Sequence, residues 1–168
     1  LLASSAASDV YKRQTWLQDI IYVVGGIRMN RKKRTEILIK SNENVAKMLA
    51  DSVREKYEIK VIEEPNQGLV MIKMRETAQK ELFYLGEVLV TEAKVYVNGA
   101  LGMGIVKGEN EELAMNLAII DGAYKANIEE LELWREILIK AQKEIEACEK
   151  REASKILETK VDFSTMDV

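Results

Sequence analysis

Residues 58–107 are rich in strand-forming residues, with apolar side chains at alternating positions in parts such as 58–64 and 93–97, and they lie between two regions in which apolar residues recur every three or four positions. Alternation is typical of a half-buried β-strand, whereas spacings of three and four are typical of one face of a helix. The sequence therefore predicts an α+β fold. We expect an antiparallel meandering sheet of four to five strands, with an N-terminal helix before it and two C-terminal helices after it, the last one long.

Turn signals divide the alternating block into strands. Residues 65–68, Pro-Asn-Gln-Gly, form a turn cluster, which predicts a hairpin between strands at 58–64 and 68–76. Asn98–Gly99 is a strong signal for a second hairpin, whose returning strand would be residues 101–108.

The long strand region at 81–99 changes its alternation partway. Val88 and Val90 share one face, whereas the apolar residues from Ala93 to Val97 share the other. A slip of one residue exchanges the buried and exposed faces of a strand. We therefore expect a β-bulge or a strand break at Thr91–Glu92.

Helical periodicity covers residues 29–57 before the strands and residues 109–126 after them. The apolar stripes are Leu38, Val45, Leu49 and Val53 in the first region, and Leu113, Leu117, Ile120 and Tyr124 in the second. Asn127 is a residue type that caps helix N-termini, so it predicts the start of the last helix, which would run to about Thr159.

The last helical region repeats its apolar residues every seven positions. One series is Leu131, Leu138 and Ile145, and a second, three positions further on, is Trp134, Ala141 and Cys148. This is a heptad seam. A helix of this length extends roughly 45 Å at about 1.5 Å per residue, which is more than a small domain needs. We therefore expect part of the seam to face a partner, through Leu131, Trp134, Leu138 and Ile145. Cys148 has no basic cluster near it and is predicted to be a core residue rather than a nucleophile.

The final segment, residues 159–168, has no periodic pattern but contains Phe163 and Met166. Unpatterned chain ends tend to fray, and disordered segments are poor in such apolar residues. We therefore expect this segment to be a docking tail, bound either to its own domain or to a partner. The residues predicted to take part are Val161, Asp162, Phe163, Thr165 and Met166.

The beginning of the chain has the composition of a cloning or sequencing scar. Residues 4–14, SSAASDVYKRQ, are similar to the translation of a transposase adapter from a sequencing library, and the chain begins at Leu1 rather than Met. Such segments are excluded from fold reasoning. We expect residues 1–28 to be a non-native leader and residues 29–168 to form a single domain.

The apolar run Trp16–Ile27 is neither a secretory signal nor a membrane span. It contains Asp19, it has no small-residue cleavage site, and it is 12 residues long against the roughly 20 that a spanning helix needs. The alternative to a leader is that residues 15–28 are genuine and form a short helix or strand.

Composition excludes several classes of function. The chain of 168 residues has no His, which removes the commonest general base and metal ligand, and its one Cys allows neither an internal disulfide nor a thiolate zinc site. The net charge is −3, and it is −4 without residues 1–28, so no basic excess is available for nucleic-acid phosphates. We expect no metal, no cofactor bound by this chain, no nucleic-acid or membrane partner, and a cytoplasmic location.

A glycine-rich stretch and two carboxylates are the remaining candidates for chemistry. Residues 98–108 place four glycines before a helix, but they lack the order of a phosphate loop and three Glu follow them. We favour glycines that serve a turn and a close approach of sheet and helix. For Asp121 we favour a structural ion pair or helix-turn bond over a ligand or partner contact. For Glu87 we favour a charge that blocks edge pairing over a contact residue. These two carboxylates are the candidates for a side chain that joins a shared active site.

Several short motifs together resemble the PhnG family, a subunit of the bacterial carbon–phosphorus lyase system. They are GLVMIKMRE at 68–76, F-x-x-G-[DE] at 83–87, T-x-A-x-V at 91–95, LGMGIVKG at 101–108, A-x-x-D at 118–121 and V-D-F-x-T-M at 161–166. Their order and spacing cover nearly all of the chain after Met29. One departure is Arg34, which stands where the family usually has Trp.

The resemblance implies a role in phosphonate catabolism. In this family the subunit works with PhnH, PhnI and PhnL to replace the adenine of ATP with a phosphonate, which gives a ribose 1-phosphonate 5-triphosphate. PhnJ, a radical iron–sulfur protein, later breaks the carbon–phosphorus bond, and PhnG, PhnH, PhnI and PhnJ form a stable core. The resemblance thus implies PhnH-like, PhnI-like and PhnJ-like partners, with a PhnL-like protein acting alongside them, and ATP and a phosphonate as substrates of the assembly.

The residues themselves favour an auxiliary role, because a chain without His, metal cluster or phosphate loop is poorly equipped to activate a phosphonate alone. Two alternatives stay open. One is a non-enzymatic homo-oligomeric scaffold joined through the seam, and the other is a small enzyme with an unrecognised carboxylate pair.

Overall fold

The computed structural model describes residues 22–24 and 27–159. The chain divides into two compact units, residues 1–36 and residues 37–168. In the first unit, β1 (Tyr22–Val24) and β2 (Ile27–Met29) pair as antiparallel strands. They lie in the stretch for which a short helix or strand was the alternative expectation. The non-native origin of residues 1–28 stays a prediction.

The helical region before the sheet is two helices rather than the single helix predicted for residues 29–57. They are α2 (Arg31–Lys40) and α3 (Glu43–Lys56). The break has a local cause, since the Asn42 side chain accepts a hydrogen bond from the Asn44 backbone N–H at 3.1 Å and so caps a new helix.

The sheet of the second unit has three antiparallel strands in the order β3-β4-β5. These are β3 (Ile59–Arg75), β4 (Leu82–Val97) and β5 (Ala100–Lys107). The expected count of four to five strands is wrong because residues 65–68 do not turn, and β3 continues through them. Pro65 lies beside register shifts at Val61/Glu63 and Glu63/Asn66, on an edge strand. Bulges and edge strands are the places where a sheet tolerates proline, which has no N–H to donate.

The predicted break at Thr91–Glu92 is also wrong, because β4 is continuous and its register with β5 is unbroken from Val90 to Val97. The two register shifts nearest this point, at Val61/Glu63 and Glu63/Asn66, add their extra residues to the partner strand β3 instead, and the third, at Ile72/Lys73, adds Leu85 to β4 six residues before Thr91. Thr91 is fully buried on the same face as the apolar residues from Ala93 to Val97. Its hydroxyl donates to the Gly108 carbonyl at 2.6 Å and accepts from the Asn110 N–H at 3.3 Å. A polar side chain thus occupies a core position, and the buried face stays the same from Thr91 to Val97.

The hairpin at Asn98–Gly99 is confirmed, with φ of 46° and 79° at the two positions. Helix α4 (Glu111–Ala126) then packs across the sheet at very short range. A Cβ at Gly102 would collide with the Ala118 carbonyl oxygen, and one at Gly104 would collide with the Ala114 carbonyl oxygen. The predicted use of these glycines, a turn and a close sheet–helix approach, is confirmed.

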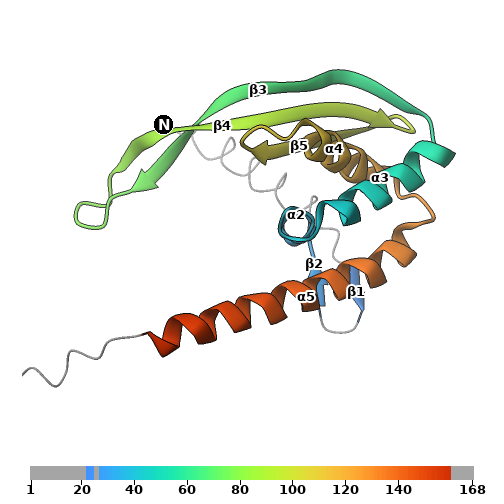
Figure 1. Cartoon of the computed structure of the whole chain (residues 1–168). Coiled ribbons are helices and arrows are strands. Elements are labelled where there is room, and N and C mark those ends of the chain that lie inside the picture. Colours follow the sequence, from blue (N-terminus) through green and yellow to red (C-terminus); the bar gives the residue numbers. More distant parts are fainter. Residues whose placement is uncertain (1–21, 25–26, 160–168) are drawn as a thin grey trace, which may run out of the picture. The chain divides into compact units, whose positions relative to one another are not determined.

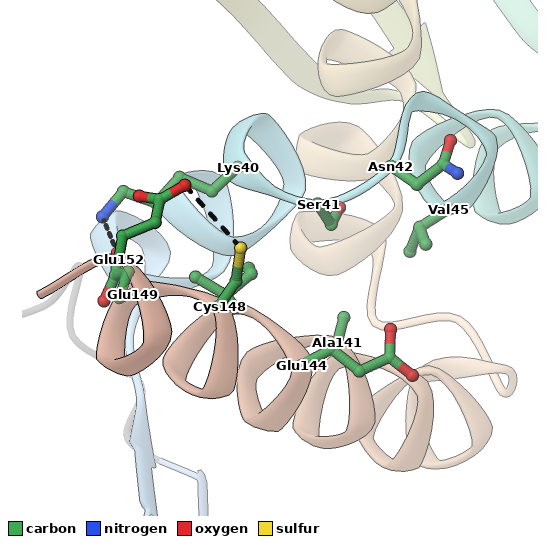
Figure 2. Close-up of a pocket in the computed structure, with 10 residues that line it drawn as sticks. Lys40, Ser41, Asn42, Val45, Ala141, Glu144, Cys148, Glu149 and Glu152 are labelled. Atoms are coloured by element: carbon green, nitrogen blue, oxygen red, sulfur yellow. Dashed lines mark hydrogen bonds and ion pairs between the residues drawn. The ribbon is translucent and has the colours of Figure 1, made fainter. Parts of the chain in front are cut away.

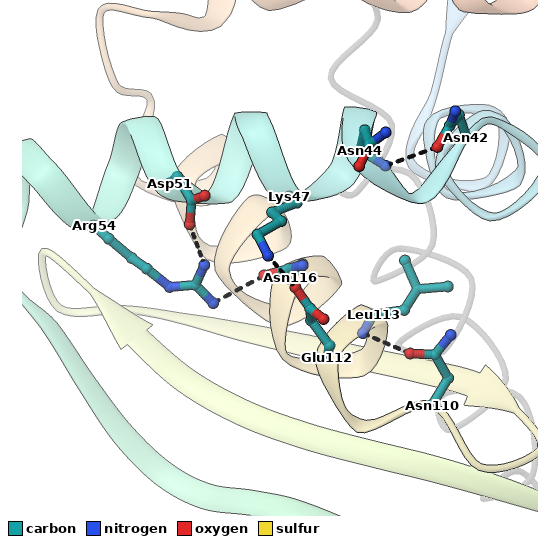
Figure 3. A network of polar contacts seen from close by, with 9 residues as sticks. All are labelled: Asn42, Asn44, Lys47, Asp51, Arg54, Asn110, Glu112, Leu113 and Asn116. Atoms are coloured by element: carbon teal, nitrogen blue, oxygen red, sulfur yellow. Dashed lines mark hydrogen bonds and ion pairs between the residues drawn. The ribbon is translucent and has the colours of Figure 1, made fainter.

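Helix α4 lies between the sheet and α3, as Figure 1 shows. It is the most buried of the described elements, with ten buried residues that include Leu113, Leu117 and Ile120. Polar contacts fix α3 against it (Figure 3). The Arg54 guanidinium donates to the Asn116 side-chain oxygen at 2.8 Å, and Lys47 pairs with Glu112 at 3.0 Å. The core of this unit therefore centres on α4.

The last helix, α5 (Leu131–Glu158), begins later than predicted. Asn127 does not start it but ends α4, with a left-handed φ of 52° and its N–H donating to the Ala123 and Tyr124 carbonyls. Asparagine tolerates this conformation, which is why it serves at helix C-termini as well as N-termini. In the part of the chain that the structure describes, no helix combines the length and the apolar character needed to cross a membrane.

Candidate subunit interface

Helix α5 is attached to α3 at its first turn through Glu130. This carboxylate accepts hydrogen bonds from Lys56 Nζ at 2.8 Å and from the Tyr57 hydroxyl at 2.5 Å. The hydrogen bond from Lys56, followed by the one from Tyr57, lowers the pKa of Glu130 below its usual value. The same contact raises the pKa of Lys56.

Replacing Glu130 by Gln should lower the melting temperature at neutral pH. A carboxyl group whose pKa is lowered by folding stabilises the folded state above its unfolded pKa, and this contribution is lost as the pH falls through the folded pKa. The difference between wild type and Glu130→Gln should therefore shrink in acid. It should also shrink in strong alkali, where Lys56 loses its proton. Thermal melts followed by circular dichroism from pH 3 to pH 8 test the acid limb.

The control is Glu129→Gln, which removes the same charge from the exposed neighbouring position. Its melting temperature should stay close to the wild-type value. Equal losses in the two variants, or a difference at Glu130 that does not depend on pH, would contradict the assignment.

The first half of the heptad seam is buried within the chain itself. The Trp134 ring packs against the Tyr124 ring, with centroids 5.8 Å apart. Trp134 and Leu138 are 2% and 0% exposed, and Leu131 and Ile145 are half-buried. Trp134 and Leu138 therefore belong to the chain's own core in this structure. The role of the four residues at a partner interface stays a prediction.

The second half of α5 is exposed on every side, from Glu146 to Glu158. Ile156 and Leu157 are 69% and 65% exposed. Cys148 is exposed too, so its predicted place in a core is wrong. Its position continues the seam in sequence, but there the helix only lines an open pocket beside the end of α2 and is not buried. The tail residues Val161, Asp162, Phe163, Thr165 and Met166 lie outside the described residues, and their docking stays a prediction.

A pocket of about 380 Å³ lies between the α2–α3 junction and α5 (Figure 2). Apolar groups from Val45, Ala141 and Ile145 line part of it. Its polar lining is mainly acidic, with three Glu against Lys40, which pairs with Glu149 at 2.8 Å. Such a lining repels anions, so the pocket does not fit a triphosphate or a phosphonate.

The structure separates the two candidate carboxylates. Asp121, on α4, accepts a hydrogen bond from the Met103 backbone N–H at 3.2 Å and pairs with Lys125 at 3.0 Å. Glu87 lies exposed on β4, seven residues before Lys94, which is the register partner of Met103. At about 3.3 Å per strand residue, the position of Glu87 lies roughly 23 Å along the sheet from the position that Asp121 contacts. They do not form a catalytic pair, and a role for either in a shared site stays a prediction.

Within the described residues, the largest group of exposed apolar side chains was not predicted from the sequence. We name it the β3–β4 arm, residues 69–75 of β3 and 82–88 of β4, where nine large apolar side chains are 39–65% exposed. They are Leu69, Val70, Met71, Ile72, Met74, Leu82, Phe83, Tyr84 and Leu85. A signal was available, because consecutive apolar residues in a strand put apolar groups on both faces.

Comparison with known proteins agrees with the resemblance drawn from the motifs. The family model for "Phosphonate metabolism protein PhnG" matches residues 29–167. A curated relative from Rhizobium meliloti (strain 1021), the alpha-D-ribose 1-methylphosphonate 5-triphosphate synthase subunit PhnG, is 27% identical over 142 residues, which cover 81% of this chain and 87% of the relative. Because the family match extends over most of the sequence, the chain belongs to the PhnG family.

Proposed function

We propose that this chain is a subunit of an α-D-ribose 1-methylphosphonate 5-triphosphate synthase. In this role it supports the transfer of a phosphonate onto the ribose of ATP with release of adenine, as part of organic phosphonate catabolism. The observation that carries the proposal is the family match over residues 29–167. The name of the Rhizobium meliloti relative supplies the reaction product.

The side chains of this subunit support a non-catalytic part in the reaction. The sequence has no His to act as a base. The glycines that precede α4 serve helix packing and the turn, and Asp121 is engaged by Met103 and Lys125. ATP and the phosphonate are accordingly substrates of the assembly, bound mainly by other subunits, and this chain holds no cofactor of its own.

The partners in this proposal are PhnH-like, PhnI-like and PhnJ-like subunits, with a PhnL-like protein acting with them in the cytoplasm. Two features of the described chain support dependence on such partners. The β3–β4 arm exposes nine large apolar side chains, and α5 exposes Ile156 and Leu157 near its end. Apolar surfaces of this extent mark protein–protein contact sites.

Reconstitution from purified components tests the proposal. The PhnH-like, PhnI-like and PhnL-like proteins of the same organism are incubated with ATP and methylphosphonate, with and without this chain, and adenine release is measured. We expect adenine release coupled to consumption of methylphosphonate only when the chain is present. Full activity of the mixture that lacks the chain would refute a supporting role.

The same assay separates this proposal from its alternatives. Turnover by the isolated chain would identify a self-sufficient enzyme. A stable homo-oligomer in light scattering that does not bind the other subunits would identify a scaffold.

A further inference from the structure

The β3–β4 arm extends past the end of β5, as Figure 1 shows. The pairing of β4 with β5 ends at Val90 opposite Lys107, whereas its pairing with β3 continues to Leu82 opposite Arg75. Over this length the described sheet has two strands only. A two-stranded ribbon buries little by itself and is marginally stable in water, so an arm of this kind is stabilised by what it binds.

Both faces of the arm are apolar. Residues directly opposite in an antiparallel pair lie on the same face, and neighbours along a strand lie on opposite faces. Leu69 and Leu89 therefore share one face, while Val70 and Val88 share the other. Leu69 is 65% exposed and Val70 is 49% exposed. An antiparallel sheet with one covered face has polar residues on the other, so the arm has the pattern of a ribbon covered on both sides.

The tip of the arm differs from its sides because it is polar and internally bonded. The Glu76 N–H donates to the Glu81 carbonyl at 2.9 Å, and the Arg75 guanidinium donates to the Lys80 carbonyl at 2.5 Å. The hairpin is therefore closed by its own hydrogen bonds and does not need a partner for its turn. The apolar surface lies between this tip and the body of the sheet.

The area and charge of the arm indicate what kind of molecule covers it. The nine side chains expose on the order of 800 Å², which is about the area that each partner contributes to a standard protein–protein interface. Residues 69–88 contain three basic and three acidic side chains, so the arm has no net charge. A membrane surface or a nucleic acid selects basic residues, whereas an uncharged apolar ribbon fits the interior of another protein.

We propose that the β3–β4 arm inserts between two apolar surfaces of another subunit of the synthase, which cover both of its faces. The identity of the partner as a synthase subunit rests on the proposed function. A second copy of this chain fits less well, because two arms stacked face to face would each leave one apolar face in water. The pocket beside α5 is not a binding site for the arm of a second copy, since its polar lining is mainly acidic and its volume is about 380 Å³.

Two single substitutions on opposite faces test insertion. Leu69→Lys and Val70→Lys each place a charge on one face, and the matched control is Ile105→Lys on β5, a strand residue that is 46% exposed in the body of the sheet. Each chain is co-expressed with the PhnH-like, PhnI-like and PhnJ-like subunits, and the affinity of the complex is measured after purification. We expect each arm variant to weaken the complex at least about tenfold and the control to leave it unchanged.

Hydrogen exchange gives a readout that does not depend on the variants. In the wild-type chain, amides of residues 69–75 and 82–88 should exchange fast in isolation and slowly in the complex, while amides of residues 91–97 should be slow in both. If circular dichroism shows that a variant has lost its fold, its binding result is set aside. The exchange pattern of the wild-type chain then tests the inference.

Four results would overturn the inference. The first is that the arm variants form the complex as well as the wild type does and that the arm amides of the wild type still exchange fast in the complex. This result leaves the proposed function intact. The second is sensitivity at Leu69 or Val70 alone, which indicates contact with a single flat surface. The third is a homodimer of the isolated chain that both substitutions dissociate, which makes a second copy the occupant. The fourth is failure of the wild type to bind any of the subunits, which refutes the proposed function as well.

Discussion

Replacing Gly104 by Val is expected to reduce the free energy of unfolding by about 3–5 kcal/mol. A Cβ at this position would collide with the Ala114 carbonyl oxygen and would lie 2.6 Å from the Ala118 backbone nitrogen. Both atoms belong to the backbone of α4, so no side-chain rotation can make room. The helix must move away from β5, and this loosens the contacts of the most buried of the described elements. Urea unfolding followed by circular dichroism measures the loss.

Gly68→Ala is the matched control, because Gly68 lies in β3 of the same sheet and has no atom within 4 Å of the added methyl group. Its stability should stay the same or rise slightly, since Ala restricts the unfolded chain more than Gly does. A Gly104→Val protein as stable as wild type would contradict the close packing of α4 on β5.

The parts of the fold that were predicted correctly depend on local signals. Asn98–Gly99 specifies its turn because both residues adopt positive φ at low cost. The stripe of Leu113, Leu117 and Ile120 predicts α4 because helix periodicity is read within a few turns. The same holds for the glycines of β5, whose alternation with larger residues indicates a strand that another backbone approaches closely.

The predictions that were wrong concern residues whose structural role depends on their neighbours in space. Pro65 breaks a central strand but is tolerated in β3, which is an edge strand. Asn127 fits both a helix start and a helix end, and the direction of the chain after α4 decides between them. Position on the sheet edge and the packing of α4 are tertiary properties that a local pattern does not contain.

Burial along α5 was predicted in part for a similar reason. A heptad pattern identifies the face of a helix that is apolar, but it does not give the length over which that face is covered. Trp134 and Leu138 are buried, whereas Cys148 continues the same pattern into an exposed stretch. The candidate interface therefore shifts from the middle of the seam to surfaces that the described chain leaves uncovered.

Replacing Trp134 by Ala is expected to cost about 3–5 kcal/mol and to lower the melting temperature by about 10 °C. The side chain is 2% exposed and packs on Tyr124, which connects α5 to α4. The described polar contacts that hold the helix against α2 and α3 are those of Glu149 and of Glu130 just before α5, so the indole, with the buried Leu138, is an apolar anchor of its first turns. Its removal should release α5 before the sheet unfolds. Hydrogen exchange in residues 131–145 should therefore accelerate more than in residues 91–97.

The neighbouring Leu133 provides the control for this variant. It lies on the same turn and is 67% exposed, so Leu133→Ala should change the stability by no more than about 0.5 kcal/mol. If Trp134→Ala left both the melting temperature and the exchange of α5 unchanged, the first half of the helix would not be part of the chain's own core. The seam residues Leu131, Trp134, Leu138 and Ile145 would then be free for a partner, as the heptad pattern had predicted.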